Sequence, residues 1–192
     1  LILIPVVLFV IIEGSILFNL FITICFIITA YEWLRMSKLN MQKIFGLFFI
    51  IISFYTIYKI RNDFDQDYFY ILLVTIICIS TDTGGYIFGK LFKGPKLTKL
   101  SPNKTYAGAI GSFLFSIIIS ILFFELILKI HNYRFTDEKF IFVLVVSLVS
   151  QMGDIIISYF KRLFKVKDTG NIIPGHGGIL DRIDGMIFAY PF

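Results

Sequence analysis

The run YAGAIGSFLFSIIISILFFELIL, residues 106–128, contains a single charged side chain, Glu125. An α-helix rises about 1.5 Å per residue, so a helix of this length crosses the roughly 30 Å hydrocarbon core of a bilayer. The run is too long and too apolar for an ordinary helix of a soluble domain. It therefore predicts a transmembrane helix.

Comparable apolar runs occur along the rest of the chain, at about 1–12, 16–34, 44–58, 68–81 and 140–157, with another opening at Met186. The sequence shows no internal repeat, and no linker rich in Pro, Ser or Gly separates a soluble domain from the rest. We expect an all-α fold, a polytopic transmembrane helical bundle of about seven spans in which residues 1–192 form one integral membrane domain. The chain starts without a methionine and stops within an apolar run, so we expect a piece trimmed at both ends.

Composition supports the membrane assignment. The chain is 57% hydrophobic and 16% charged, with a mean hydropathy of +0.85. We interpret the formal charge of +5 as basic residues that set the membrane topology and contact anionic lipid headgroups. We therefore exclude nucleic acid as a partner. Cys25 and Cys78 lie in separate apolar runs, which favours neither a disulfide nor a zinc site.

Basic residues are distributed unevenly between the loops that the spans define. The first, third and fifth loops hold 13 of the 18 Lys and Arg residues. These are Arg35, Lys38, Lys43, Lys90, Lys93, Lys96, Lys99, Lys104, Lys161, Arg162, Lys165, Lys167 and Arg182. The positive-inside rule therefore predicts that these three loops face the cytoplasm.

The third loop, with the helix end before it, reads STDTGGYIFGKLFKGPKLTKLSPNKTYAG, residues 80–108. Asp82 directly follows an apolar run, and an ionisable group at a membrane helix end is costly enough to indicate function. The glycines and five lysines after it suit a phosphate cradle, since backbone N–H groups and ammonium groups can share the negative charge. The alternative to a phosphate-binding role is that these lysines set the membrane topology and contact anionic lipid.

The fifth loop combines carboxylates with cations. Asp154 lies near the end of an apolar run, and Asp181 and Asp184 are spaced to share a helix face. Carboxylates near phosphate-binding cations are typical of a magnesium site, because Mg²⁺ takes hard oxygen ligands and completes its shell with phosphates and water. The basic side chains available to neutralise the phosphates are Lys161, Arg162, Lys165 and Lys167. The loop thus indicates a metal–nucleotide site.

His176 lies in the sequence Pro174-Gly-His-Gly-Gly, where the glycines and the proline predict an unusual backbone. Two roles stay open for it: a hydrogen-bond donor to phosphate, or a residue that shapes the loop. Zinc is disfavoured because no second histidine or cysteine is within reach.

These residues together resemble a known family. The pattern Ser158-x-x-Lys161-Arg162-x₄-Lys167-Asp168-x₅-Pro174-Gly-His-Gly-Gly-x-x-Asp181-Arg182-x-Asp184 resembles the signature of the phosphatidate cytidylyltransferases, the CDP-diacylglycerol synthases. The third loop is similar too, with Asp82-x-x-x-Tyr86-x-x-Gly89 and Ser101-Pro-x-Lys104-Thr105-x-x-Gly108. The chain departs from the family at Ile157, Tyr106 and Ala107, where glutamate, tryptophan and glutamate are common.

The resemblance implies a reaction in which phosphatidate attacks the α-phosphorus of CTP to give CDP-diacylglycerol and pyrophosphate. Its implied cofactor is Mg²⁺, alone or with a second cation, held by Asp154 and Asp181. Catalytic roles fall to Asp154, Asp181, Lys167 and His176. Substrate binding falls to Asp82, Lys104, Ser158, Lys161, Arg162, Asp168, Arg182 and Asp184.

The implied setting is a bacterial inner membrane, with the motif loops and CTP on the cytoplasmic side. The implied partners are CTP, phosphatidate and membrane lipids, and assembly as a homodimer is left open. Two other functions are alternatives to this reaction. A membrane anion transporter would predict midplane charges and inverted repeats, neither of which is evident. Another CTP- or CDP-dependent lipid transferase of the CDP-alcohol type would need a D-G-x-x-A-R motif, which is absent.

Overall fold

The computed structural model describes residues 3–64, 68–98, 104–131, 135–172 and 177–192. Within these ranges the chain is helical and forms no strand, apart from one isolated bridge between Lys96 and Thr105. The elements are α1 (Leu3–Glu13), α2 (Ser15–Met36), α3 (Asn40–Lys59), the π-helical turn η1 (Ile60–Phe64), α4 (Phe69–Phe92), α5 (Tyr106–His131), α6 (Asp137–Leu163), α7 (Leu180–Ile183) and α8 (Met186–Ala189). The all-α prediction is confirmed.

Five helical segments are long and apolar enough to cross a membrane. They are Ser15–Met36, Asn40–Asp63, Phe69–Phe92, Tyr106–Leu126 and Asp137–Leu163. The first and last predicted runs are shorter: α1 has 11 residues and α8 has four, whereas a span needs about 20. The chain is therefore a multi-pass membrane protein with five candidate spans among the described residues.

The outer surfaces of α2 and α3 are apolar. Leu20 is 57% exposed, Ile27 58% and Phe48 62%. Exposed apolar side chains on this scale are unusual in soluble monomers and are expected where lipid covers a helix. The surface thus agrees with the candidate spans.

Helix α4 extends beyond the span predicted from hydropathy. We expected the apolar run to end at residue 81, but α4 continues to Phe92 through Gly84 and Gly85. Small residues let its backbone approach that of α5: a Cβ atom on Gly84 would lie 2.7 Å from the carbonyl oxygen of Gly111, and one on Gly108 2.8 Å from that of Gly85. These glycines therefore serve helix packing, in the way that small residues do in membrane bundles.

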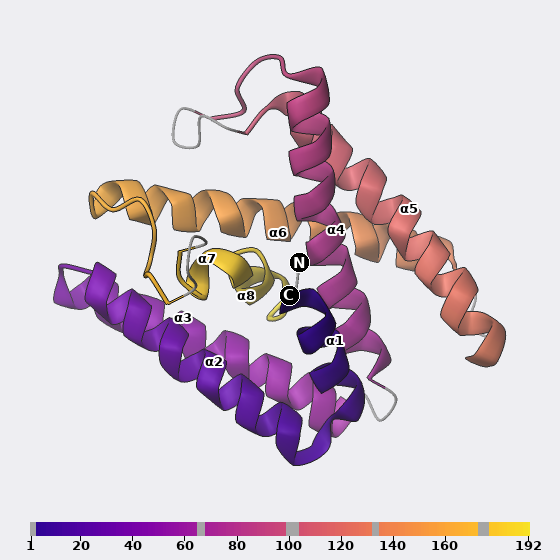
Figure 1. The fold of residues 1–192 in the computed structure, drawn as a ribbon, viewed down its shortest axis with the longest axis horizontal. Helices are drawn as coiled ribbons and strands as arrows, with labels where there is room; N and C mark the ends of the chain where they lie inside the picture. Colours follow the sequence, from indigo (N-terminus) through magenta and orange to yellow (C-terminus); the bar gives the residue numbers. More distant parts are fainter. Residues whose placement is uncertain (1–2, 65–67, 99–103, 132–134, 173–176) are drawn as a thin grey trace.

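Figure 1 shows where the candidate membrane helices end relative to one another. The C-terminal ends of α2 and α6 lie toward the left of the view, whereas that of α4 lies at the top. Short helices α7 and α8, in yellow, lie between α6 and the α2–α3 pair. The shared cytoplasmic side of the loops after α2, α4 and α6 stays a prediction from the alternation of basic residues.

Candidate active site

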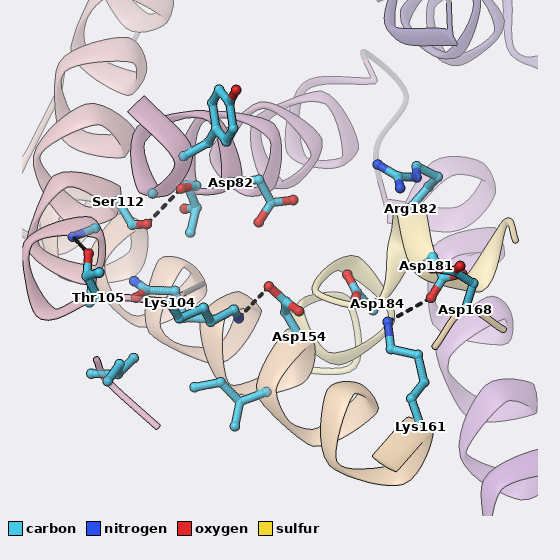
Figure 2. A pocket seen from close by; sticks show the side chains of 18 residues that line it. Asp82, Lys104, Thr105, Ser112, Asp154, Lys161, Asp168, Asp181, Arg182 and Asp184 are labelled. Carbon is cyan, nitrogen blue, oxygen red and sulfur yellow. Dashed lines mark hydrogen bonds and ion pairs between the residues drawn. The ribbon is translucent and has the colours of Figure 1, made fainter. Parts of the chain in front are cut away.

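A cavity of about 390 Å³ opens between α4, α5, α6 and the segment around α7. Among the described residues, its acidic and basic lining consists of five aspartates and three basic residues: Asp82, Asp154, Asp168, Asp181, Asp184, Lys104, Lys161 and Arg182 (Figure 2). All eight were selected from the sequence. The structure therefore brings both motif loops to one site.

Lys104 connects the two motifs. It lies just before α5, in a loop whose sides are joined by hydrogen bonds from the backbone N–H of Leu97 to the carbonyl oxygen of Lys104 (2.7 Å) and from Tyr106 to Pro95 (3.2 Å). Its ammonium group forms an ion pair with Asp154 on α6, drawn in Figure 2. The lysine thus reaches from the first motif to a carboxylate of the second.

Asp154 and Asp184 are held close together by a glycine. A Cβ atom on Gly153 would lie 2.8 Å from the carbonyl oxygen of Asp184, so only glycine lets the turn after α7 pack this closely on α6. One helical turn beyond Asp154, the Ser158 hydroxyl donates a long hydrogen bond of 3.4 Å to Asp154 Oδ1. The Gly-Asp pair thus brings two carboxylates to the same wall of the cavity.

Asp184 is buried, with 7% of its surface exposed. Burial, and then the neighbouring charges of Asp154 and Asp82, raise the pKa of this carboxyl well above its usual value. Lys161 and a 2.9 Å hydrogen bond from the Gly185 backbone N–H act in the opposite direction. Negative charge in this part of the cavity is therefore incompletely compensated.

Asp181 has the opposite environment. Its Oδ1 is 2.8 Å from Lys161 Nζ, and its Oδ2 accepts hydrogen bonds from the backbone N–H groups of Thr169 (2.8 Å) and Gly178 (3.0 Å). Burial alone would raise the pKa of Asp181, but the hydrogen bonds and the ammonium charge outweigh it and hold the pKa below its usual value. Asp181 is thus a fixed carboxylate that carries its charge at neutral pH.

Asp82 lies on α4 at the other wall, with its side chain exposed to the cavity. Hydroxyl groups fix the helix at this point: Thr81 Oγ1 donates to Ser147 Oγ on α6 (2.8 Å), and Ser112 Oγ on α5 donates to the Thr81 carbonyl oxygen (2.7 Å). These contacts join α4 to both neighbouring helices beside Asp82. The position of Asp82 is therefore set by packing inside the bundle.

Four selected residues are not placed in the cavity by the described coordinates. Ser158 contacts Asp154 but is not among the described residues that line the cavity. Arg162 and Lys167 are exposed and do not belong to the described residues that line the cavity. His176 falls outside the described residues. Their assigned roles stay predictions.

Sequence reasoning missed two polar residues near the site. Thr169 donates hydrogen bonds to Asp181 and to Glu32, a buried carboxylate near the end of α2. Glu32 falls within the run assigned to the second span, and a carboxylate there is the signal that could have identified it, because ionisable groups in membrane helices are rare.

The donor set of the cavity is compatible with a divalent cation. Carboxylate oxygens are the hard ligands that Mg²⁺ prefers, and five aspartates face three basic side chains in the described lining. A nucleotide triphosphate would add further negative charge. Among the described residues no three His, Cys, Asp or Glu side chains are grouped closely enough to hold a metal ion by themselves, so a cation bound here would depend on substrate oxygens as well.

The cavity combines carboxylates with basic side chains and lies between helices that are long and apolar enough to cross a membrane. This arrangement is typical of an integral membrane enzyme that acts on a phosphate-bearing substrate. The sequence model of the Cytidylyltransferase family matches residues 43–192, and the chain belongs to that family. The phosphatidate cytidylyltransferase of Rickettsia conorii is 38% identical over 163 residues, covering 82% of this chain and 70% of the relative. Those of Rickettsia typhi and Staphylococcus epidermidis are 36% and 35% identical, covering 83% and 88% of this chain and 72% and 65% of the relatives.

Proposed function

We propose that this protein transfers the cytidylyl group of CTP to phosphatidate, giving CDP-diacylglycerol and pyrophosphate. The observation that carries the proposal is the cavity in which Lys104 of one motif pairs with Asp154 of the other. The names of its relatives, phosphatidate cytidylyltransferases from bacteria, support the same reaction. The setting we infer is a bacterial inner membrane.

The chemistry requires mainly positioning and charge neutralisation. The attacking group is an oxygen of the phosphatidate phosphate, which is already an anion, and the bond that breaks joins the α-phosphorus of CTP to the oxygen of the leaving pyrophosphate. Little base catalysis is needed for such a nucleophile. Lys104, Lys161 and Arg182 line the cavity where the phosphates would bind, and we assign them to offset the phosphate charge.

Asp154 and Asp181 would hold Mg²⁺, alone or with a second cation. A cation held there would supply positive charge to the phosphates and to the leaving pyrophosphate. Asp181 suits the role because its pKa is held low. Asp181 Oδ1 also lies 2.8 Å from Lys161 Nζ, and we assign this ammonium group to the phosphates.

The remaining assignments belong to the same proposal. Asp82, Asp168 and Asp184 line the polar cavity, and Ser158 acts through Asp154. We assign Arg162 and Lys167 to contact phosphate from the exposed side, and His176 keeps its predicted catalytic role. The motif loops face the cytoplasm, where CTP is available, and the lipid substrate and product stay in the bilayer. The expectation of about seven spans within residues 1–192 goes beyond the five candidate spans of the described residues and stays a prediction. Assembly as a homodimer also stays a prediction.

The test is a product assay. Membranes that contain the protein are incubated with cytidine-labelled CTP, MgCl₂ and phosphatidate, and the organic extract is examined for label. We expect a lipid-soluble cytidine product that depends on all three additions. Replacing phosphatidate by diacylglycerol is the matched control, because diacylglycerol lacks the attacking phosphate. Label in the extract with diacylglycerol, or none with phosphatidate, would refute the proposal.

A further inference from the structure

Glu32 has a buried carboxylate, only 1% exposed, four residues before the end of α2. It lies outside residues 43–192, the part of the chain that matches the family. Its Oε1 accepts a hydrogen bond from the backbone N–H of Ile179 (3.0 Å), and its Oε2 accepts one from that of Leu180 (2.9 Å). A charged group buried this deeply is retained only where donors satisfy it, and here the donors come from the segment that carries Asp181.

Thr169 links Glu32 to Asp181. Its Oγ1 lies 3.1 Å from Glu32 Oε2 and 3.0 Å from Asp181 Oδ2. A hydroxyl group has one proton to donate, so the two carboxylates share it, while the Thr169 backbone N–H also donates to Asp181 Oδ2 (2.8 Å). Glu32 thereby contacts the chain on both sides of residues 173–176, at Thr169 before them and at Ile179 and Leu180 after them.

Two glycines make room for the Glu32 carboxylate. A Cβ atom on Gly170 would lie 2.6 Å from Glu32 Oε1, with only Glu32 atoms among its three nearest neighbours, and one on Gly178 would lie 2.4 Å from Glu32 Oε2. Neither distance is compatible with a side chain. The carboxylate therefore occupies the space that these two glycines leave empty.

We propose that Glu32 is a positioning residue whose carboxylate holds Thr169–Gly170 and Gly178–Leu180 in the arrangement that presents Asp181 to the cavity. Glu32 itself is not among the described residues that line the cavity, so it acts through Asp181. The proposal rests on the proposed function for its effect on turnover. Its structural part, the attachment of this segment to α2, can be measured without any reaction.

The experiment compares Glu32→Gln with Glu138→Gln, a matched change at an exposed glutamate in the first turn of α6. The glutamine keeps the shape of the side chain but turns an N–H₂ group toward a donor, either Ile179 or Leu180. Hydrogen exchange of the purified protein in detergent should become faster in peptides that cover 168–172 and 177–181 in Glu32→Gln, and stay unchanged in those of α4 and α5. Glu138→Gln should leave all of them unchanged.

The kinetic arm separates positioning from general loss of structure. In Glu32→Gln we expect kcat to fall roughly tenfold or more while the KM for phosphatidate stays within about twofold, as when an interaction made in the transition state is lost. Wild-type exchange and turnover in Glu32→Gln would overturn the proposal. So would faster exchange throughout α4, α5 and α6, because that is the result of a role in global stability alone.

A double-mutant cycle remains informative if Glu32→Gln folds poorly. Gly170→Ala places a methyl group against the carboxylate and should speed exchange in the same peptides. In a Glu32→Ala background that space is vacant, so the added effect of Gly170→Ala should largely disappear; additive effects would contradict the contact. If wild-type protein produced no CDP-diacylglycerol, the proposed function would fail, and the exchange data would still decide whether Glu32 holds the segment.

Discussion

Lys104 and Asp154 form an ion pair across the cavity, although 50 positions separate them in the sequence. The lysine precedes α5 and the aspartate lies on α6, and both side chains are partly exposed, at 24% and 29%. A pair this exposed contributes little to stability. The ion pair matters for the geometry of the site, because it brings a cation and a carboxylate from separate motifs into the same cavity.

Lys104→Ala should therefore reduce turnover strongly and stability little. We expect a loss of roughly a hundredfold or more in kcat/KM for CTP, the scale found when a major charge at a reacting centre is removed. Lys96→Ala is the control, since Lys96 is an exposed lysine of the same loop that does not line the cavity. Equal losses in the two variants, measured with labelled CTP, would show that the loop acts only through its total charge.

Asp184→Asn should stabilise the protein in the absence of substrate and metal at neutral and higher pH. The folded-state pKa of Asp184 is raised above its usual value, so the folded state holds the proton more tightly than the unfolded state. The wild type consequently loses stability as the pH rises from the unfolded pKa, about 4, through the folded pKa, and Asp184→Asn should lack this loss.

Thermal unfolding in detergent at several pH values measures the effect of Asp184→Asn. The unfolding midpoint of the variant should exceed that of the wild type by roughly 2–4 °C for each kcal/mol of repulsion that is relieved, and the difference should shrink at acidic pH. MgCl₂ should raise the midpoint of the wild type more than that of the variant. A variant that is less stable than the wild type at pH 8 would contradict the repulsion.

Lys167→Ala should damage turnover more than Lys165→Ala. Both lysines are exposed and belong to the same loop, but Lys167 directly precedes Asp168, which lines the cavity. Attraction to anionic lipid contributes about 1 kcal/mol per charge near the surface and does not depend on a particular position. If both variants lose CTP affinity equally, or if anionic lipid restores both, Lys167 contacts the membrane surface and has no role with phosphate.

The predicted sidedness can be tested by labelling single cysteines. After Cys25 and Cys78 are replaced, Asn171→Cys and Thr136→Cys place a thiol at exposed positions, after α6 and before α6 respectively. An impermeant reagent should label position 136 in intact cells, and position 171 only once the cytoplasmic face is accessible. The reverse pattern would overturn the topology.

Some features of the fold could be predicted from local composition, because long apolar runs have few alternatives to membrane helices. The extent of α4 could not. Its last turns contain Gly84, Gly85 and Gly89, which suggested a loop, and their helical form depends on close packing against Gly108 and Gly111 of α5. Glycine lowers helix propensity locally, and only the partner helix, distant in sequence, reverses that preference.

The candidate site likewise combines features that could be predicted from the sequence with features that could not. The residue types and their spacing were enough to select the eight ionisable residues of the described lining. Their individual environments were not predictable, because Asp181 and Asp184 differ by three positions and yet have pKa values shifted in opposite directions. That difference depends on Thr169, Gly178 and Lys161, which only the folded chain places beside Asp181.

The central claim is that this cavity transfers a cytidylyl group, and the most direct measurement is the yield of both products in wild type and in Asp154→Asn. The wild type should convert CTP and phosphatidate into CDP-diacylglycerol and pyrophosphate in equal amounts. Asp154→Asn, which keeps the shape of the side chain but removes its charge, should form both products at least about a hundredfold more slowly. Wild-type rates in a well-folded Asp154→Asn protein, or pyrophosphate without a cytidine-bearing lipid in the wild type, would contradict the account.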